Sequence, residues 1–123
     1  MKKGNVLVIE DNRLNMKLIR TVLQLQGNYQ VLEAQNAEEG LEIAYKFHPN
    51  VILMDIQLPG IDGLSTTRFI KSDPELRDIP VVAVTSSAKL ADVEKSFAAG
   101  CVGHISKPID VHTFIDTLEQ FIL

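Results

Sequence analysis

The chain alternates short apolar runs with longer segments of mixed polarity. Three runs are continuously apolar, at residues 6–9, 51–54 and 81–84. A run without polar alternation is typical of a strand that is covered on both faces, as in a parallel sheet. Two weaker runs, at residues 29–33 and 102–106, carry polar residues and predict strands at the edges of the same sheet.

The segments between these runs show helical periodicity. The first helix is predicted over residues 13–26, with Gly27 as its stop. Its buried face is predicted from four apolar positions at helical spacing, which are Leu14, Leu18, Val22 and Leu25. A second helix is predicted to begin at Asn36 and Glu39, whose spacing of three residues resembles a capping box.

Three further helices complete the alternation. The third is predicted over residues 64–71 and ends in a loop before Pro74. The fourth ends at Gly100 and carries an apolar stripe made of Leu90, Val93 and Phe97. The fifth is capped by Asp110 and carries an apolar stripe made of Phe114, Leu118, Phe121 and Ile122.

Strands that alternate with helices through short loops pair in parallel, with right-handed crossovers. With the two polar runs at the edges, the strand order becomes 2-1-3-4-5. This order is that of the flavodoxin-like, doubly wound α/β fold, a five-stranded parallel sheet with helices on both faces. Because no linker or repeat divides the sequence, we expect one domain over residues 1–123.

Such sheets bind ligands beyond the carboxyl ends of their strands, at the switch point of the topology. The polar residues at these strand ends are Glu10, Asp11, Asp55, Thr85 and Lys107. Taken singly, an acidic residue after a strand is most often a helix cap or a solvated charge. Three carboxylates at one sheet edge repel each other, however, and this costs free energy unless a cation lies between them.

These carboxylates predict a magnesium site. Hard oxygen ligands suit Mg²⁺, and the absence of cysteine and histidine at these strand ends disfavours zinc. We expect Asp11 to bind the ion directly and Glu10 to act partly through water. The main-chain carbonyl of Gln57, in the turn expected at residues 57–60, is a further candidate ligand.

The same site predicts phosphoryl transfer. A carboxylate beside Mg²⁺ can attack phosphorus and form an acyl phosphate. Asp55 is the predicted nucleophile because it ends the central strand, between the other contributors. Thr85 and Lys107 are predicted to help the ion neutralise the phosphoryl oxygens.

Composition narrows the function further. The chain has 123 residues, of which 46% are hydrophobic and 23% charged, as in ordinary globular proteins. Its net charge of -4 argues against direct nucleic-acid binding. A lone cysteine, Cys101, excludes an intrachain disulfide and favours a reducing compartment. Since no apolar stretch approaches the roughly 20 residues of a membrane span, we expect a soluble, cytoplasmic protein.

Four segments together resemble the receiver domain of two-component response regulators, over essentially the whole chain. The resemblance is strongest to stand-alone single-domain regulators and to the receivers of hybrid kinases. The segments span residues 8–12, 53–63, 79–85 and 105–108 and read Val-Ile-Glu-Asp-Asn, Leu-Met-Asp-Ile-Gln-Leu-Pro-Gly-Ile-Asp-Gly, Ile-Pro-Val-Val-Ala-Val-Thr and Ile-Ser-Lys-Pro.

The resemblance implies a phosphorelay switch rather than an enzyme. It implies that a sensor histidine kinase or a histidine phosphotransfer protein donates its phosphoryl group to Asp55, and that Asp11, Asp55 and the Gln57 carbonyl hold Mg²⁺. Thr85 would bond a phosphoryl oxygen, and Lys107 would pair with the phosphoryl group and precede a cis proline. The expected output is altered binding of a downstream protein, with a weak homodimer as a further expectation.

One position departs from the family pattern. Three residues before the lysine the family usually carries Tyr or Phe, but here the residue is His104. An imidazole can move between exposed and packed positions, and a merely exposed edge-strand histidine is the alternative. Gln57 and Ser87 occupy positions that in this family tune the lifetime of the acyl phosphate, in a direction that the sequence leaves open.

Two functions of other classes are weighed against the switch. A magnesium-dependent phosphatase would also use an aspartyl phosphate, but the second aspartate expected two residues after Asp55 is replaced by Gln57. A cofactor-binding module is compatible with the fold. However, the first strand–helix turn, at residues 10–13, is acidic and contains no glycine, so it would repel a cofactor phosphate.

Overall fold

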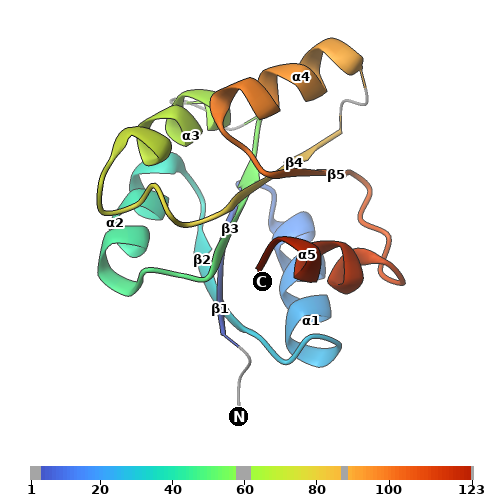
Figure 1. The fold of residues 1–123 in the computed structure, drawn as a ribbon. Coiled ribbons are helices and arrows are strands. Elements are labelled where there is room, and N and C mark those ends of the chain that lie inside the picture. Colours follow the sequence, from blue (N-terminus) through green and yellow to red (C-terminus); the bar gives the residue numbers. More distant parts are fainter. Residues whose placement is uncertain (1–3, 58–61, 87–88, 123) are drawn as a thin grey trace.

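A computed structural model describes residues 4–57, 62–86 and 89–122 of the chain. In these residues, five strands alternate with five helices along the sequence (Figure 1). The strands are β1 (Asn5–Ile9), β2 (Gln30–Ala34), β3 (Val51–Asp55), β4 (Val81–Thr85) and β5 (Gly103–Ser106). The helices are α1 (Arg13–Leu25), α2 (Ala37–Phe47), α3 (Gly63–Ser72), α4 (Leu90–Ala99) and α5 (Phe114–Ile122).

The strands form one parallel sheet in the order β2-β1-β3-β4-β5, which confirms the predicted flavodoxin-like topology. In Figure 1, α1 and α5 lie on one side of this sheet, and α2 and α3 lie on the other, with α4 beside α3. The register pairs Ile9 with Met54, Asp55 with Val84, and Thr85 with Ser106. The carboxyl ends of the four strands that carry polar site residues therefore meet at one edge.

Two apolar clusters fill the space between the sheet and its helices. Val8, Leu53 and Val82 face α1 and α5, where Leu118 is fully buried. Alternate residues of the same strands, such as Ile52, pack into the cluster on the other face. Both faces of the central strands are thus covered, which explains the continuous apolar runs. Each fully buried aliphatic side chain stabilises the fold by roughly 1.5–3 kcal/mol relative to exposure.

The predicted buried face of α1 is partly wrong. Leu14 and Leu25 are 78% and 81% exposed, whereas Val22 is buried and Leu18 packs partly against the core. The face turned to the sheet consists of Met16, Ile19, Val22 and Leu23. Both sets of residues repeat at helical spacing, so periodicity alone could not choose between them.

α1 ends at Leu25 with Gln26 as its C-cap, so Gly27 follows the helix end as predicted, but it does so without a left-handed conformation. The C-cap residue Gln26 is right-handed, and the left-handed residue is Asn28, with φ of 55°. A Cβ at Gly27 would lie 2.7 Å from Cδ2 of Tyr29 and 2.8 Å from Cδ1 of Ile115. Glycine is therefore needed here for close packing rather than for a left-handed turn.

The boundaries of α2, α3 and α4 agree with the sequence, but the predicted apolar stripe of α4 does not. The N-cap Asn36 accepts a hydrogen bond from the Glu39 amide at 2.9 Å, and α4 ends at Gly100 with φ of 114°. On α4, however, Leu90 and Phe97 are 72% and 47% exposed. The buried residues of this helix are the small Ser96 and Ala99, which allow it to lie close to its neighbours.

The fifth helix begins later than its cap. The side chain of Asp110 accepts a hydrogen bond from the His112 amide, and the main-chain carbonyl of Asp110 accepts one from the Phe114 amide. These bonds form a turn that leads into α5. In the part of the chain that the structure describes, no helix combines the length and apolar character needed to cross a bilayer.

Candidate functional site

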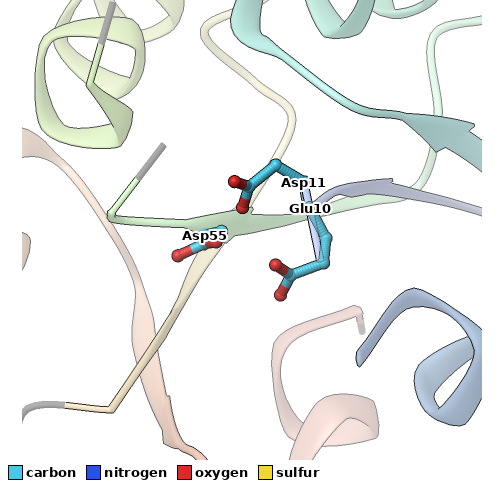
Figure 2. Close-up of side chains that lie close together, drawn as sticks. All are labelled: Glu10, Asp11 and Asp55. Carbon is cyan, nitrogen blue, oxygen red and sulfur yellow. The ribbon is translucent and has the colours of Figure 1, made fainter. Parts of the chain in front are cut away.

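Three carboxylates gather at the carboxyl edge of the sheet. Glu10 and Asp11 follow β1, and Asp55 is the last residue of β3, so the neighbouring strands bring them together. One oxygen of each lies within 4.8 Å of the others. Figure 2 shows the three side chains reaching into one space from the ends of the two strands. The structure thus brings together the acidic residues predicted from the sequence.

Hydrogen bonds fix two of these carboxylates. Glu10 is 2% exposed, and its Oε2 accepts a hydrogen bond from the Asn12 amide at 3.1 Å. Asp55 is 3% exposed, and its Oδ1 accepts one from the Gln57 amide at 2.9 Å. Asp11 is exposed at the rim of the site. The two inner groups are therefore pre-oriented, while the third is open to solvent.

Lys107 lies between the buried carboxylates. Its Nζ is 2.8 Å from Oε1 of Glu10 and 3.4 Å from Oδ2 of Asp55. Burial alone would lower the pKa of Lys107, but the two carboxylates outweigh this effect and raise it. The amide of Lys107 donates to the carbonyl of Thr85 at 2.8 Å, and the peptide bond to Pro108 is cis, as the family resemblance implied.

The ammonium neutralises only part of this negative charge. Burial raises the pKa of Glu10, and the nearby Asp55 adds to the effect, while Lys107 and the Asn12 amide oppose it. Oε1 of Glu10 is buried and, within the described residues, accepts no hydrogen bond of good geometry despite its ion pair. A buried oxygen with unused acceptor capacity, beside two more carboxylates, fits a metal ion with oxygen ligands.

A cleft of about 570 Å³ opens above the carboxylates. Its lining includes Asp55, Gln57, Ser86 and Lys107. Thr85 is 3% exposed and lines a smaller neighbouring pocket of about 160 Å³, which it shares with Gln57. The predicted hydroxyl therefore sits beside the main cleft rather than in its wall. Beyond Gln57, the turn expected at residues 57–60 lies outside the described residues, and so does Ser87.

His104 is neither fully exposed nor fully packed. The residue is half-buried on the edge strand β5, and its Nε2 is shielded from solvent. None of the described residues forms a hydrogen bond with that nitrogen. The alternative of a merely exposed edge-strand histidine is therefore wrong for this conformation.

Sequence reasoning missed three residues that shape the site. Asn12 orients Glu10, Ser86 bonds to Gln57, and Gly63 lies against the backbone of the acceptor strand. The bond to Glu10 comes from the main-chain amide of Asn12, so the identity of this residue gave no signal for it, whereas a glycine at a helix start was a visible signal for Gly63. Ser86 offered no signal, because its partner is 29 residues away in the sequence.

Glu10→Gln is expected to stabilise the metal-free protein at neutral pH. The raised pKa means that the folded state holds the Glu10 proton more tightly than the unfolded state. Stability is therefore lost as the pH rises from about 4.5 through the folded pKa. The amide mimics the protonated form and avoids that loss. At pH 7, we expect a gain in the free energy of unfolding on the order of 1 kcal/mol.

Urea unfolding in the presence of a chelator, at pH 4 and pH 7, measures this difference. The gain should shrink at the lower pH, and Glu42→Gln, which removes an exposed charge on α2, serves as the control. A lower free energy of unfolding for Glu10→Gln at pH 7 would mean that the Lys107 ion pair outweighs burial.

Comparison with known proteins gives one consistent family. Residues 6–119 match the sequence profile of the response regulator receiver domain. The polar-differentiation response regulator DivK of Brucella ovis is 45% identical over 118 residues, which cover 96% of this chain and 95% of that protein. DivK of Brucella anthropi matches at the same identity and coverage.

Solved structures give the same fold. The receiver domain of sensor histidine kinase PA1611 from Pseudomonas aeruginosa PAO1, with a magnesium ion coordinated in its active-site cleft, has a TM-score of 0.88. It is 30% identical, with 97% of each chain covered. The chemotaxis response regulator CheY4 of Vibrio cholerae has a TM-score of 0.89 at 23% identity, with 98% of each chain covered, and supports the fold alone.

Proposed function

Because the chain belongs to the response regulator receiver domain family, whose members act in phosphorelay signalling, we propose that Asp55 is its phosphoryl acceptor. The observation that carries the proposal is the placement of this carboxylate. Asp55 is buried at the end of the central strand β3, and its Oδ1 is held by the Gln57 amide. Its Oδ2 lies toward Lys107 and is the oxygen proposed to react.

The proposed transfer is a displacement at phosphorus. Oδ2 of Asp55 attacks the phosphorus of a phosphohistidine on the partner whose other ring nitrogen carries a proton, the P–N bond breaks with its electron pair going to the ring, and the imidazole leaves in its neutral form. Lys107 then pairs with the new phosphoryl group, since its Nζ already lies 3.4 Å from Oδ2 of Asp55, the oxygen proposed to react. The hydroxyl of Thr85, at the end of the adjacent strand, approaches a phosphoryl oxygen.

Mg²⁺ is the proposed cofactor. Asp11 and Asp55 would hold it together with the carbonyl of Gln57, and Glu10 would act partly through water. When bound, the ion supplies positive charge that offsets the charge of the phosphoryl oxygens. Support comes from the cluster of three carboxylates, whose oxygen ligands suit Mg²⁺, and from the magnesium-bound receiver of Pseudomonas aeruginosa.

The proposed partners are a sensor histidine kinase or a histidine phosphotransfer protein as donor, and a downstream protein as receiver of the signal. Movement of Thr85 toward the phosphoryl group would shift the surface formed by β4, α4, β5 and α5. His104 on β5 can respond because its buried Nε2 is not held by a hydrogen bond from the described residues. The exposed Leu90 and Phe97 on α4 give that surface apolar area for a protein partner or a weak homodimer.

Phosphorylation by acetyl phosphate and by a phosphorylated histidine phosphotransfer domain tests the proposal. With Mg²⁺, intact-mass spectrometry should show the addition of one phosphoryl group. Borohydride reduction should then convert the acyl phosphate at position 55 to homoserine. A chelator should reduce labelling to background, and excess Mg²⁺ should restore it. In the same sample, the ring resonances of His104 report whether the signal reaches β5.

A label on a serine or threonine, or labelling that persists unchanged with the chelator, would contradict the proposal. Unchanged His104 resonances in a fully labelled sample would contradict the readout alone.

A further inference from the structure

Among the described residues, His104 is the histidine that combines partial burial with a shielded ring nitrogen. His48 and His112 are exposed, whereas His104 is half-buried on the edge strand β5. Its Nε2 is shielded from solvent and forms no hydrogen bond with the described residues. Because the proposed readout of phosphorylation includes this residue, the chemistry of its ring affects how the signal is expressed.

His104 and Thr85 lie on the same face of the sheet. Val84 and Ile105, which are paired across β4 and β5, belong to the apolar cluster under α1 and α5. Because side chains alternate along a strand, Thr85 and His104 point to the opposite face. The buried side chain of Thr85 occupies space on that face. Its movement toward the phosphoryl group therefore leaves room beside the ring of His104.

A proton on the ring opposes a fully packed position. Imidazole is the side chain that ordinarily gains a proton just below neutral pH. In the packed position, a proton on Nε2 has no acceptor among the described residues, and burying a charge without a partner costs free energy. When the ring turns out to solvent, water solvates the same proton. Protonation therefore favours the outward ring, and phosphorylation favours the packed one.

The charged group nearest to this path acts in the same direction. A cavity of about 260 Å³ is lined by His104, by the segment after β5 and by the start of α5. Asp110 lines it and is exposed, so its carboxylate attracts a protonated ring that turns outward. Ala83, which is paired with His104 on β4, carries no charge. The described lining contains none of the charged residues of α4 and α5, which are Asp92, Glu94, Lys95, Asp116 and Glu119.

From this arrangement we infer that His104 makes the switch sensitive to pH, because its protonated ring stays outward below neutral pH and weakens the response of β5 to phosphorylation. The inference rests on the proposed acceptor role of Asp55 and adds a second input, the proton, to that site. Tyrosine and phenylalanine, the usual residues at this position in the family, do not gain or lose a proton near neutral pH. The histidine is therefore the source of the sensitivity.

NMR spectroscopy of the wild-type protein tests the opposition between the phosphoryl group and the proton. The sample is held at the pH at which half of the His104 rings are protonated and is then labelled with acetyl phosphate and Mg²⁺. The ring should release its proton to solvent, and its nitrogen resonances should move toward those of the neutral form. A tenfold coupling lowers the protonated fraction from one half to about one tenth. The exposed His112 should keep its protonation and serves as the internal control.

His104→Phe removes the titrating group and restores an aromatic ring of the kind that the family carries. In the wild type, phosphorylation should displace the amide resonances of β5 several-fold less at about pH 5.5 than at about pH 7.5. In His104→Phe, the displacement should be the same at both pH values. His104→Gln, which is polar but never charged, should also lose the pH dependence and tests the inference if phenylalanine packs badly. His112→Gln, the matched control, should respond to pH like the wild type.

The outcomes separate this inference from the proposed function. Equal protonation of the His104 ring before and after full labelling would overturn the inference and leave Asp55 as the acceptor. A pH dependence that persists in both His104 variants would overturn it as well. The absence of a label from Asp55 in the wild type would instead contradict the proposed function. Intact mass at each pH distinguishes these cases, because it reports labelling independently of the resonances.

Discussion

Asp55→Asn is expected to abolish phosphoryl labelling under conditions in which the wild-type protein is fully labelled. The amide has nearly the shape of the carboxylate and can still accept the hydrogen bond from the Gln57 amide. It lacks the negative charge that makes the carboxylate oxygen nucleophilic. The expected result is therefore loss of the label without loss of the fold, measured by intact mass after incubation with acetyl phosphate and Mg²⁺.

Asp62→Asn provides the matched control. Asp62 caps α3 by accepting a hydrogen bond from the Ser65 amide at 2.7 Å, and asparagine caps helices equally well. This variant makes the same chemical change, from a carboxylate to an amide, at the start of α3. It should be labelled like the wild type. A label that persists at position 55 in Asp55→Asn, or a second site that is labelled as fast, would remove Asp55 from its proposed role.

Gly63→Ala should destabilise the protein by about 2 kcal/mol, the usual cost of overpacking, and lower Tm by roughly 8 °C. A Cβ at Gly63 would clash with the carbonyl oxygen of Asp55 and lie 2.8 Å from Cα of Ile56. Both contacts are with backbone, which cannot rotate away. Helix propensity predicts the opposite sign, because alanine favours helices over glycine by about 1 kcal/mol.

Thermal unfolding of Gly63→Ala, measured beside Gly40→Ala, shows whether the alanine at position 63 lowers or raises the stability of the protein. Gly40 is also helical, but the three atoms nearest to a Cβ there all belong to the side chain of Ile9. We expect a smaller loss at Gly40, where that side chain can adjust. We also expect slower labelling of Gly63→Ala, because the clash displaces the strand end that carries Asp55. Equal or higher stability of Gly63→Ala would show that α3 can shift at little cost.

The fold was predictable because the sequence encodes strand burial directly. The continuous runs at β1, β3 and β4 and the mixed runs at β2 and β5 separate central strands from edge strands. The strand order then placed the acidic residues at one edge, where the structure has them. This reasoning needs only the alternation of side chains along strands and the rules for crossovers.

Side-chain detail was less accessible from the sequence. On α1, two stripes fit the helical period, and only the packing of the helix on the sheet selected Met16 over Leu14. On α4, the apolar residues Leu90 and Phe97 face outward, because the helix makes its contacts through small residues. The bond from Ser86 to Gln57 depends on rotamers in two loops, which periodicity does not constrain.

Every residue of β3 is buried, whereas β5 is partly exposed. The two strands are therefore expected to differ in how easily they move. Local opening of a protein costs the most free energy where burial is deepest and the least at its periphery. The proposed acceptor, Asp55, is thus carried by a strand whose residues are all buried, where local opening costs the most free energy. β5, which carries His104, is less buried, so we expect local opening to cost less free energy there. We therefore expect a phosphoryl group gained at Asp55 to displace β5 more readily than β3, so that the acceptor strand keeps its position while the edge strand moves.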